Sequence, residues 1–218
     1  MAEVDLLRRY PRARRNIAKR HAAQTEENIR LAKQYGREYF DGNRDTGYGG
    51  YSYDGRWIPI AEDMVDHFGL ADGSRVLDVG AGKGFLVKDF AIASPGLEAF
   101  GLDISEYALR HCEPEVVGRL HLGSADSLPF PDDSFDAVVS INTLHNLDRD
   151  RCIVALREIT RVSRGGCYVQ VDSYRTEEER ELFLSWVLTA TTHYFPDGWR
   201  ELFAEAGYDG DYYWTIVE

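Results

Sequence analysis

The chain has 218 residues and a mass of 24.8 kDa, the size of one domain with at most a short appended segment. It has no run of about 18 apolar residues that could cross a membrane and no signal-peptide pattern, so we expect a cytoplasmic protein. Its three isolated cysteines argue against a disulfide framework or structural zinc, and its net charge of -12 argues against a nucleic-acid partner.

The charge is unevenly distributed along the chain. Residues 1–20 have a surplus of five positive charges, which leaves -17 for the rest out of the total of -12. This basic segment is expected to be a solvated helix face, although it could also dock on the acidic body or serve an anionic ligand. Its basic residues are Arg8, Arg9, Arg12, Arg14, Arg15, Lys19 and Arg20.

Two regions differ in composition. Residues 1–59 are charged at first and then rich in Gly and Tyr, whereas residues 60–218 alternate short apolar runs with amphipathic, helix-length segments. The alternation predicts an α/β fold with a doubly wound, mostly parallel sheet, and we expect both regions to form one globule. The predicted strands are 75–79, 99–104, 120–123, 136–141, 167–172 and 212–217, and the predicted helices include 150–163, 177–190 and 199–206.

A glycine-rich turn follows the first predicted strand, in VLDVGAGKGFL (residues 76–86). Glycines between a strand and a helix let the backbone turn tightly and approach a ligand closely. The spacing GxGxG, with Asp78 two residues before the first glycine, differs from the GxGxxG of dinucleotide-binding folds. Since such turns also occur without a ligand, this turn alone is only moderately specific.

Two further aspartates follow the next two strands. Asp103 ends the second strand about 20 residues after the turn, where a carboxylate can accept the hydroxyls of an unmodified ribose. Asp126, just beyond the third strand, could accept the amine of an adenine. Either residue could instead cap the following helix or turn, but three such features at successive strand ends indicate a nucleotide-like cofactor.

The turn, both aspartates, LPFPDDSFDAVVSINTLHNL (residues 128–147) and LREITRVSRGG (residues 156–166) together resemble the class I S-adenosylmethionine-dependent methyltransferases, in their small-molecule branch. The resemblance covers about residues 60–172 and implies S-adenosyl-L-methionine as cofactor, a sheet of seven strands and an N-terminal lid. Because this sequence has one closing strand, 212–217, where the family has two, a sheet of six strands is equally expected. The resemblance implies these contacts: the methionine part with Asp78, Gly80, Ala81 and Gly82, the ribose with Asp103, the adenine with Ile104, Ala125 and Asp126, and the sulfonium with Asn142.

Lys83 departs from this family, which more often has a small or hydroxyl residue there. Its ammonium is expected either near the cofactor carboxylate or in solvent.

Candidate catalytic residues follow the fourth and fifth predicted strands. His145 could take a proton from the acceptor, although a packing role is the stronger expectation for it. Asp172 is the next candidate, and His193 could contribute from a later loop. The fourth strand lacks the [DN]PP[YF] sequence of amide and adenine N-methyltransferases, no Pro-Cys pair indicates a cysteine nucleophile, and no residue cluster indicates a metal.

The segment GYGGYSYDGRW (residues 47–57) supplies flexible glycines, aromatic faces and hydroxyl groups. Aromatic faces would favour a sulfonium or an ammonium group, but an ordered loop packed on the core is equally compatible with this sequence. The candidate substrate-binding residues are Tyr48, Tyr51, Tyr53, Trp57 and, after the fifth strand, Tyr174.

The sequence therefore predicts methyl transfer from S-adenosyl-L-methionine to an O or N atom of a small polar metabolite, which could be anionic. It leaves a homodimer open and predicts no nucleic-acid or membrane partner. Two alternatives remain at this point: a non-catalytic cofactor-binding subunit and a nicotinamide-dependent reductase.

Overall fold

A computed structural model describes residues 1–12 and 15–217. Six strands form one sheet in the order β3-β2-β1-β4-β5-β6, and each neighbouring pair is parallel. The predicted doubly wound sheet is confirmed, with six strands in the described residues. The strands are β1 (Arg75–Val79), β2 (Glu98–Asp103), β3 (Leu120–Leu122), β4 (Phe135–Ile141), β5 (Ser163–Asp172) and β6 (Asp211–Thr215).

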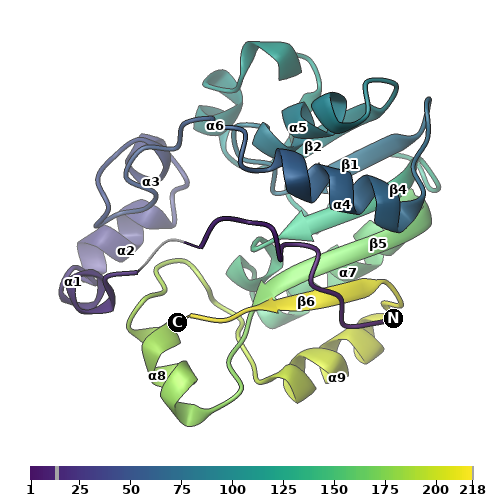
Figure 1. Cartoon of the computed structure of the whole chain (residues 1–218). Helices are drawn as coiled ribbons and strands as arrows, with labels where there is room; N and C mark the ends of the chain where they lie inside the picture. The colour runs from purple at the N-terminus through teal and green to yellow at the C-terminus, as the bar shows by residue number, and fades with distance from the viewer. Residues whose placement is uncertain (13–14, 218) are drawn as a thin grey trace.

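The helices cover both faces of this sheet and extend beyond its edge (Figure 1). The first three belong to the N-terminal segment and lie beyond the arrowhead ends of β5 and β6, on the side that also carries α8. The α-helices are α1 (Ile17–Ala22), α2 (Glu26–Ala32), α3 (Arg37–Phe40), α4 (Ile58–Phe68), α5 (Phe85–Ala93), α6 (Glu106–Arg110), α7 (Arg149–Val162), α8 (Glu177–Leu184) and α9 (Pro196–Ala206), with 3-10 turns η1 (Pro114–Val116) and η2 (Leu144–Asn146).

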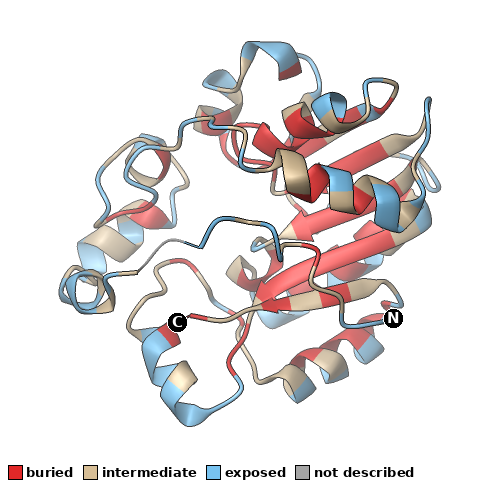
Figure 2. Cartoon of the chain, viewed as in Figure 1, coloured by how far each residue is buried: buried red, intermediate tan, exposed pale blue. Residues whose placement is uncertain are grey.

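Successive residues along the strands belong alternately to two separate apolar cores, one on each face of the sheet. Val138 faces the core formed with α7 and α9, while Ala137 and Val139 face the core formed with α4 and α5. This period of two is what a sheet covered on both faces requires. Figure 2 shows the burial concentrated in the strands, whereas α1 and α2 are largely intermediate or exposed.

Two predicted boundaries are wrong, each because of a tertiary contact. The strand predicted over 167–172 begins earlier, at Ser163, and a Cβ on Gly165 would lie 2.0 Å from the Asp136 carbonyl oxygen, so glycine permits the close approach of β4. The helix predicted over 177–190 ends at Leu184. The Gln24 side chain donates to the carbonyls of Leu184 at 2.9 Å and Val187 at 2.6 Å, which caps this helix end.

The start of the chain docks on its own body. Backbone hydrogen bonds join Ala2 and Val4 to Tyr212 of β6. Arg8 then pairs with Asp63 of α4, and Arg9 pairs with the same carboxylate and with Glu62. Part of the predicted basic segment therefore neutralises an acidic helix; its Arg14 lies outside the described residues. The predicted division at residues 59 and 60 falls within α4.

Candidate functional site

The glycine turn lies at the carboxyl edge of the sheet, where ligands of parallel α/β folds bind. The Gly80 and Ala81 N–H groups donate to the Leu102 carbonyl at 2.7 and 3.0 Å, which fixes the turn against the end of β2. Gly80 has φ +92°, and a Cβ there would lie 1.9 Å from Thr143 Oγ1. This position requires glycine, because both the backbone angle and the close approach exclude a side chain.

Asp78 supplies a buried carboxylate beside this turn. It is 5% exposed, and no described side chain forms an ion pair or a hydrogen bond with it. Burial, followed by the neighbouring charge of Asp103, raises the pKa of Asp78 to about 7. A buried acid without a partner is suited to a cationic ligand, whose charge would favour the ionised form.

Asp103 is held in a fixed orientation at the end of β2. Its two carboxylate oxygens accept from the Gly82 N–H at 2.7 Å and the Ser105 N–H at 2.8 Å. Burial raises the pKa of Asp103, and these backbone hydrogen bonds act in the opposite direction. Directly after it, Ile104 is 54% exposed and offers an apolar surface beside the carboxylate.

The end of β3 carries the third predicted aspartate. Asp126 accepts from Arg151 Nε of α7 at 2.5 Å and also from the Ser124 hydroxyl. Arg151 holds the pKa of Asp126 below its usual range, so this carboxylate stays ionised. Ala125, next to it, is buried. An adenine amine would thus meet a carboxylate that is already paired with a guanidinium.

Asn142, at the end of β4, adopts an uncommon backbone conformation with φ +53°. Asparagine tolerates this left-handed region better than most residues, and such conformations are concentrated at functional sites. A line of hydrogen bonds across the sheet orients its side chain: Tyr168 donates to Gln170, Gln170 to Thr215, and Thr215 to Asn142 Oδ1 at 2.7 Å.

His145 and Asp172 form a pair between β4 and β5. The Asp172 backbone N–H donates to His145 Nδ1 at 3.0 Å, so the proton of the neutral ring must be on Nε2, which lies 3.4 Å from Asp172 Oδ2. His145 is 4% exposed, and burial lowers its pKa. Both ring nitrogens therefore face Asp172, and the carboxylate is the more accessible member of the pair.

His193 and Tyr174 form a second polar contact close to this pair. The Tyr174 hydroxyl lies 3.1 Å from His193 Nδ1, and the charges of Asp172 and His145 both affect the pKa of His193, which burial lowers. Tyr174 is buried in a small apolar cluster with Phe183, so His193 is the more accessible of the two.

The structure separates the four aromatic residues predicted from segment 47–57. Tyr51 stacks on Phe85 at 4.5 Å and lies over Gly82, and Tyr48 packs on Tyr51 at 4.4 Å. Tyr48 is 40% exposed, and burial, with the charges of Asp103 and Asp172 contributing, raises its pKa to about 12.

The other two aromatic residues of this segment have different partners. The Tyr53 hydroxyl donates to Asp89 of α5 at 2.5 Å, and Trp57 packs on Tyr10 at 4.6 Å. The Tyr53 ring also contacts Phe85, the first residue of α5 after the glycine turn, at 5.7 Å, whereas no ring contact joins Trp57 to that turn among the described residues.

Lys83 points neither to a cofactor carboxylate nor to solvent. It is 7% exposed, and its Nζ contacts both oxygens of Asp41 at 2.7 Å and the Tyr51 carbonyl at 2.9 Å. The Tyr107 hydroxyl adds a hydrogen bond to Asp41 at 2.8 Å. Although burial acts to raise it, the hydrogen bonds from Lys83 and Tyr107 lower the pKa of Asp41 overall. The Lys83–Asp41 ion pair thus connects the glycine turn to the N-terminal segment.

Replacing Lys83 with methionine is expected to loosen this segment. The Asp41 carboxylate would lose its cationic partner, a loss of about 1–3 kcal/mol, so amide hydrogen exchange across residues 39–52 should accelerate by roughly an order of magnitude or more. Lys33→Met, at an exposed lysine of the same segment, is the matched control. Equal exchange in both variants would contradict the fastening role.

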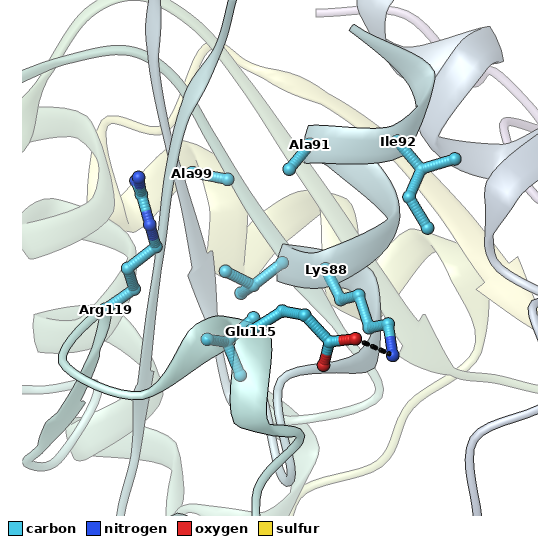
Figure 3. A pocket seen from close by; sticks show the side chains of 8 residues that line it. Lys88, Ala91, Ile92, Ala99, Glu115 and Arg119 are labelled. Atoms are coloured by element: carbon cyan, nitrogen blue, oxygen red, sulfur yellow. Dashed lines mark ion pairs between the residues drawn. The ribbon is translucent and has the colours of Figure 1, made fainter. Parts of the chain in front are cut away.

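Two cavities do not include the glycine turn in their lining, and the larger, of about 370 Å³, is lined by residues that include Arg175, Asp197 and Arg200. The other, of about 200 Å³, lies between α5 and η1, beside the Lys88–Glu115 ion pair (Figure 3). Its lining residue Ala99 belongs to the opposite end of β2, away from the glycine turn. Within residues 1–12 and 15–217 no group of three potential metal ligands gathers, and no helix there is long and apolar enough to span a membrane.

Comparison with known proteins gives consistent matches. Residues 77–171 match a family described as a methyltransferase domain. The uncharacterized methyltransferase YcgJ of Bacillus subtilis is 36% identical over 132 residues, covering 57% of this chain and 47% of YcgJ. A demethylmenaquinone methyltransferase of Renibacterium salmoninarum is 38% identical over 114 residues, covering 51% of this chain and 44% of that protein.

The structural comparison concerns the fold. The crystal structure of YcgJ aligns with a TM-score of 0.54 and 22% identity, over 67% of this chain and 66% of that chain. This chain spans about half the length of the two curated relatives that it matches in sequence.

Proposed function

We propose, on the premise that this chain carries a class I S-adenosylmethionine-dependent methyltransferase domain, that it methylates an O or N atom of a small polar metabolite. The observation that carries the proposal is the unpaired, buried carboxylate of Asp78 beside a glycine turn, with a histidine–aspartate pair at the neighbouring strand ends. The matched family consists of methyltransferases, which supports an enzyme rather than the two alternatives left open by the sequence.

The residues at the strand ends fit the cofactor. Asp78 would hold the ammonium of its methionine part, since this acid has no other partner. Asp103 would accept the ribose hydroxyls, and the exposed side chain of Ile104 would lie against the adenine. When bound, S-adenosyl-L-methionine supplies a methyl group on a positively charged sulfur, which is already activated for displacement.

The chain itself must align the acceptor and remove its proton. We assign the role of general base to the carboxylate of Asp172, which would take the proton of the acceptor. His145 is not available for this role, because both of its ring nitrogens face Asp172. His145 would then position Asp172, and its lowered pKa keeps the ring neutral near pH 7. His193 would complete the polar wall on the acceptor side. Holding the acceptor in line with the methyl group supplies the remaining acceleration.

The polarity of the site favours a polar acceptor. Tyr48, Asp172 and His193 would bring oxygen or nitrogen atoms to the acceptor. The name of the relative from Renibacterium salmoninarum suggests a second candidate, methylation of a quinone. A lipid quinone would need an apolar channel, so these polar groups favour the first candidate.

Two measurements test the proposal. Calorimetry should detect micromolar binding of S-adenosylhomocysteine, and protein incubated with methyl-labelled cofactor and a polar metabolite extract should yield a labelled product identified by mass spectrometry. A folded protein that binds no S-adenosylhomocysteine would refute the cofactor site. Label found in added demethylated quinones and absent from polar compounds would favour the second candidate.

Replacing Asp103 with alanine should weaken binding of S-adenosylhomocysteine by about 1–3 kcal/mol, because the buried ribose hydroxyls would lose their acceptor. Calorimetry of the variant measures this loss, and circular dichroism checks that the turn still folds without the carboxylate. The control is Asp209→Ala, at an exposed aspartate outside the site. Unchanged affinity in Asp103→Ala would place the ribose elsewhere.

A further inference from the structure

Arg20 of α1 carries a cation whose hydrogen-bonding capacity is only partly used. Its Nη2 donates to the Gly47 carbonyl at 3.1 Å, and the guanidinium lies over the Trp186 ring, 4.8 Å from the centroid. Its Nη1 is buried and has no hydrogen-bond partner. A buried donor on a charged group is expensive to leave unpaired, so the arrangement suggests an absent acceptor.

The surroundings of Arg20 are positively charged. Burial lowers its pKa, and the charge of Arg44 acts in the same direction. Asp45 acts in the opposite direction, but among residues 1–12 and 15–217 no carboxylate forms an ion pair with Arg20. Arg15 lies over the same Trp186 ring at 5.4 Å and donates to the Ile216 carbonyl. The guanidinium groups of Arg15 and Arg44 are thus close to that of Arg20, and no described carboxylate pairs with it.

This positive cluster lies between the segment that packs on the glycine turn and the region after β5. Gly47, the partner of Arg20, directly precedes Tyr48, which packs on Tyr51 over Gly82 of the glycine turn. On the opposite side, Trp186 packs in the cluster of Tyr174, which contacts His193. Arg20 therefore contacts both the N-terminal segment, at Gly47, and the region after β5, at Trp186.

We propose that Arg20 binds a carboxylate of the methyl acceptor while the atom to be methylated faces Asp172. This inference rests on the methyl transfer proposed above and specifies its substrate class as a small carboxylic acid. The planar guanidinium edge matches a carboxylate, and Trp186 holds the guanidinium in plane. A single negative charge suits the site better than a phosphate, because the rest of the acidic chain repels multiply charged anions.

The test compares wild type with Arg20→Gln in methyl-label transfer to a polar metabolite extract, whose products are then separated by anion exchange. We expect label in the retained fraction, resistant to phosphatase. Arg20→Gln should lower the rate of its formation by roughly 10- to 100-fold, the loss expected for a hydrogen-bonded charge pair. The affinity for S-adenosylhomocysteine should be unchanged. Arg20→Lys keeps the charge without the planar edge, so its rate of product formation should lie between the rates of wild type and Arg20→Gln.

Arg30→Gln, at an exposed arginine of α2 that pairs with Glu27, is the control and should behave as wild type. Unchanged affinity for S-adenosylhomocysteine shows that Arg20→Gln is folded. Label confined to the unretained fraction, retained label removed by phosphatase, or an equal rate in Arg20→Gln would each overturn the inference. Absence of S-adenosylhomocysteine binding in the wild type would instead overturn the proposed function itself.

Discussion

Replacing Asp172 with asparagine is expected to slow methyl transfer by roughly 10²- to 10⁴-fold, the usual contribution of a general base. Asparagine keeps the size and the backbone N–H bond to His145 but cannot accept a proton. Binding of S-adenosylhomocysteine should be unchanged, because the residues proposed to hold the cofactor lie at other strand ends. The rate is measured as label transfer to the acceptor, and the affinity by calorimetry.

The control is Asp150→Asn, at a side chain that is 93% exposed on α7. His145→Asn should reduce the rate less than Asp172→Asn does, since the ring positions the base and does not itself take the proton. The reverse order of effects would assign the proton to His145. A rate equal to that of wild type in Asp172→Asn would show that the acceptor needs no base from this pair.

Asp78→Asn is expected to stabilise the fold at neutral pH and weaken cofactor binding. The pKa of Asp78 is raised to about 7 in the folded chain, so the folded state holds its proton more tightly than the unfolded state does. As pH rises from about 4 to 7, the unfolded chain ionises first and the free energy of unfolding falls. Asparagine removes this penalty, worth about 1–4 kcal/mol at pH 8 and little at pH 4.

Denaturant unfolding at pH 4 and pH 8 measures this difference. For binding, the loss of a charge-assisted partner for the cofactor ammonium should cost about 1.5–3 kcal/mol, or roughly tenfold or more in affinity. For binding, Asp89→Asn is the control, since Asp89 is buried but pairs with Tyr53. An Asp78→Asn variant that is destabilised at pH 8, or binds S-adenosylhomocysteine as wild type does, contradicts this role.

The fold was predictable because its signals are local. Short apolar runs predicted the strands. The glycines after β1 predicted a tight turn there, because few other local structures require glycine at this spacing. The ends of α8 and β5 were not predictable in the same way. One depends on Gln24, far away in sequence, and the other on how closely β4 approaches Gly165.

The candidate site was predictable where a residue's position on a strand determines its location. Asp78 and Asp103 lie at the carboxyl edge because their strands end there. The partner of Lys83 was not predictable, because Asp41 belongs to a segment whose path no periodicity describes. The same is true of Tyr48 and Tyr53, which are close in sequence but face different parts of the molecule. In a segment without regular secondary structure, the spacing between two residues in the sequence does not determine which way their side chains point.

The chain of hydrogen bonds from Tyr168 through Gln170 and Thr215 to Asn142 runs in one donor-to-acceptor direction. This direction limits what Asn142 can bind. Thr215 uses its proton on Asn142 Oδ1, so the carbonyl end of the amide is occupied. No described group accepts from the Nδ2 end of this exposed side chain. The Nδ2 donors of Asn142 are therefore available to a bound molecule. Its neighbour in the bound complex should be an electron-rich oxygen or nitrogen, of the cofactor or of the acceptor, more readily than the positive sulfur itself.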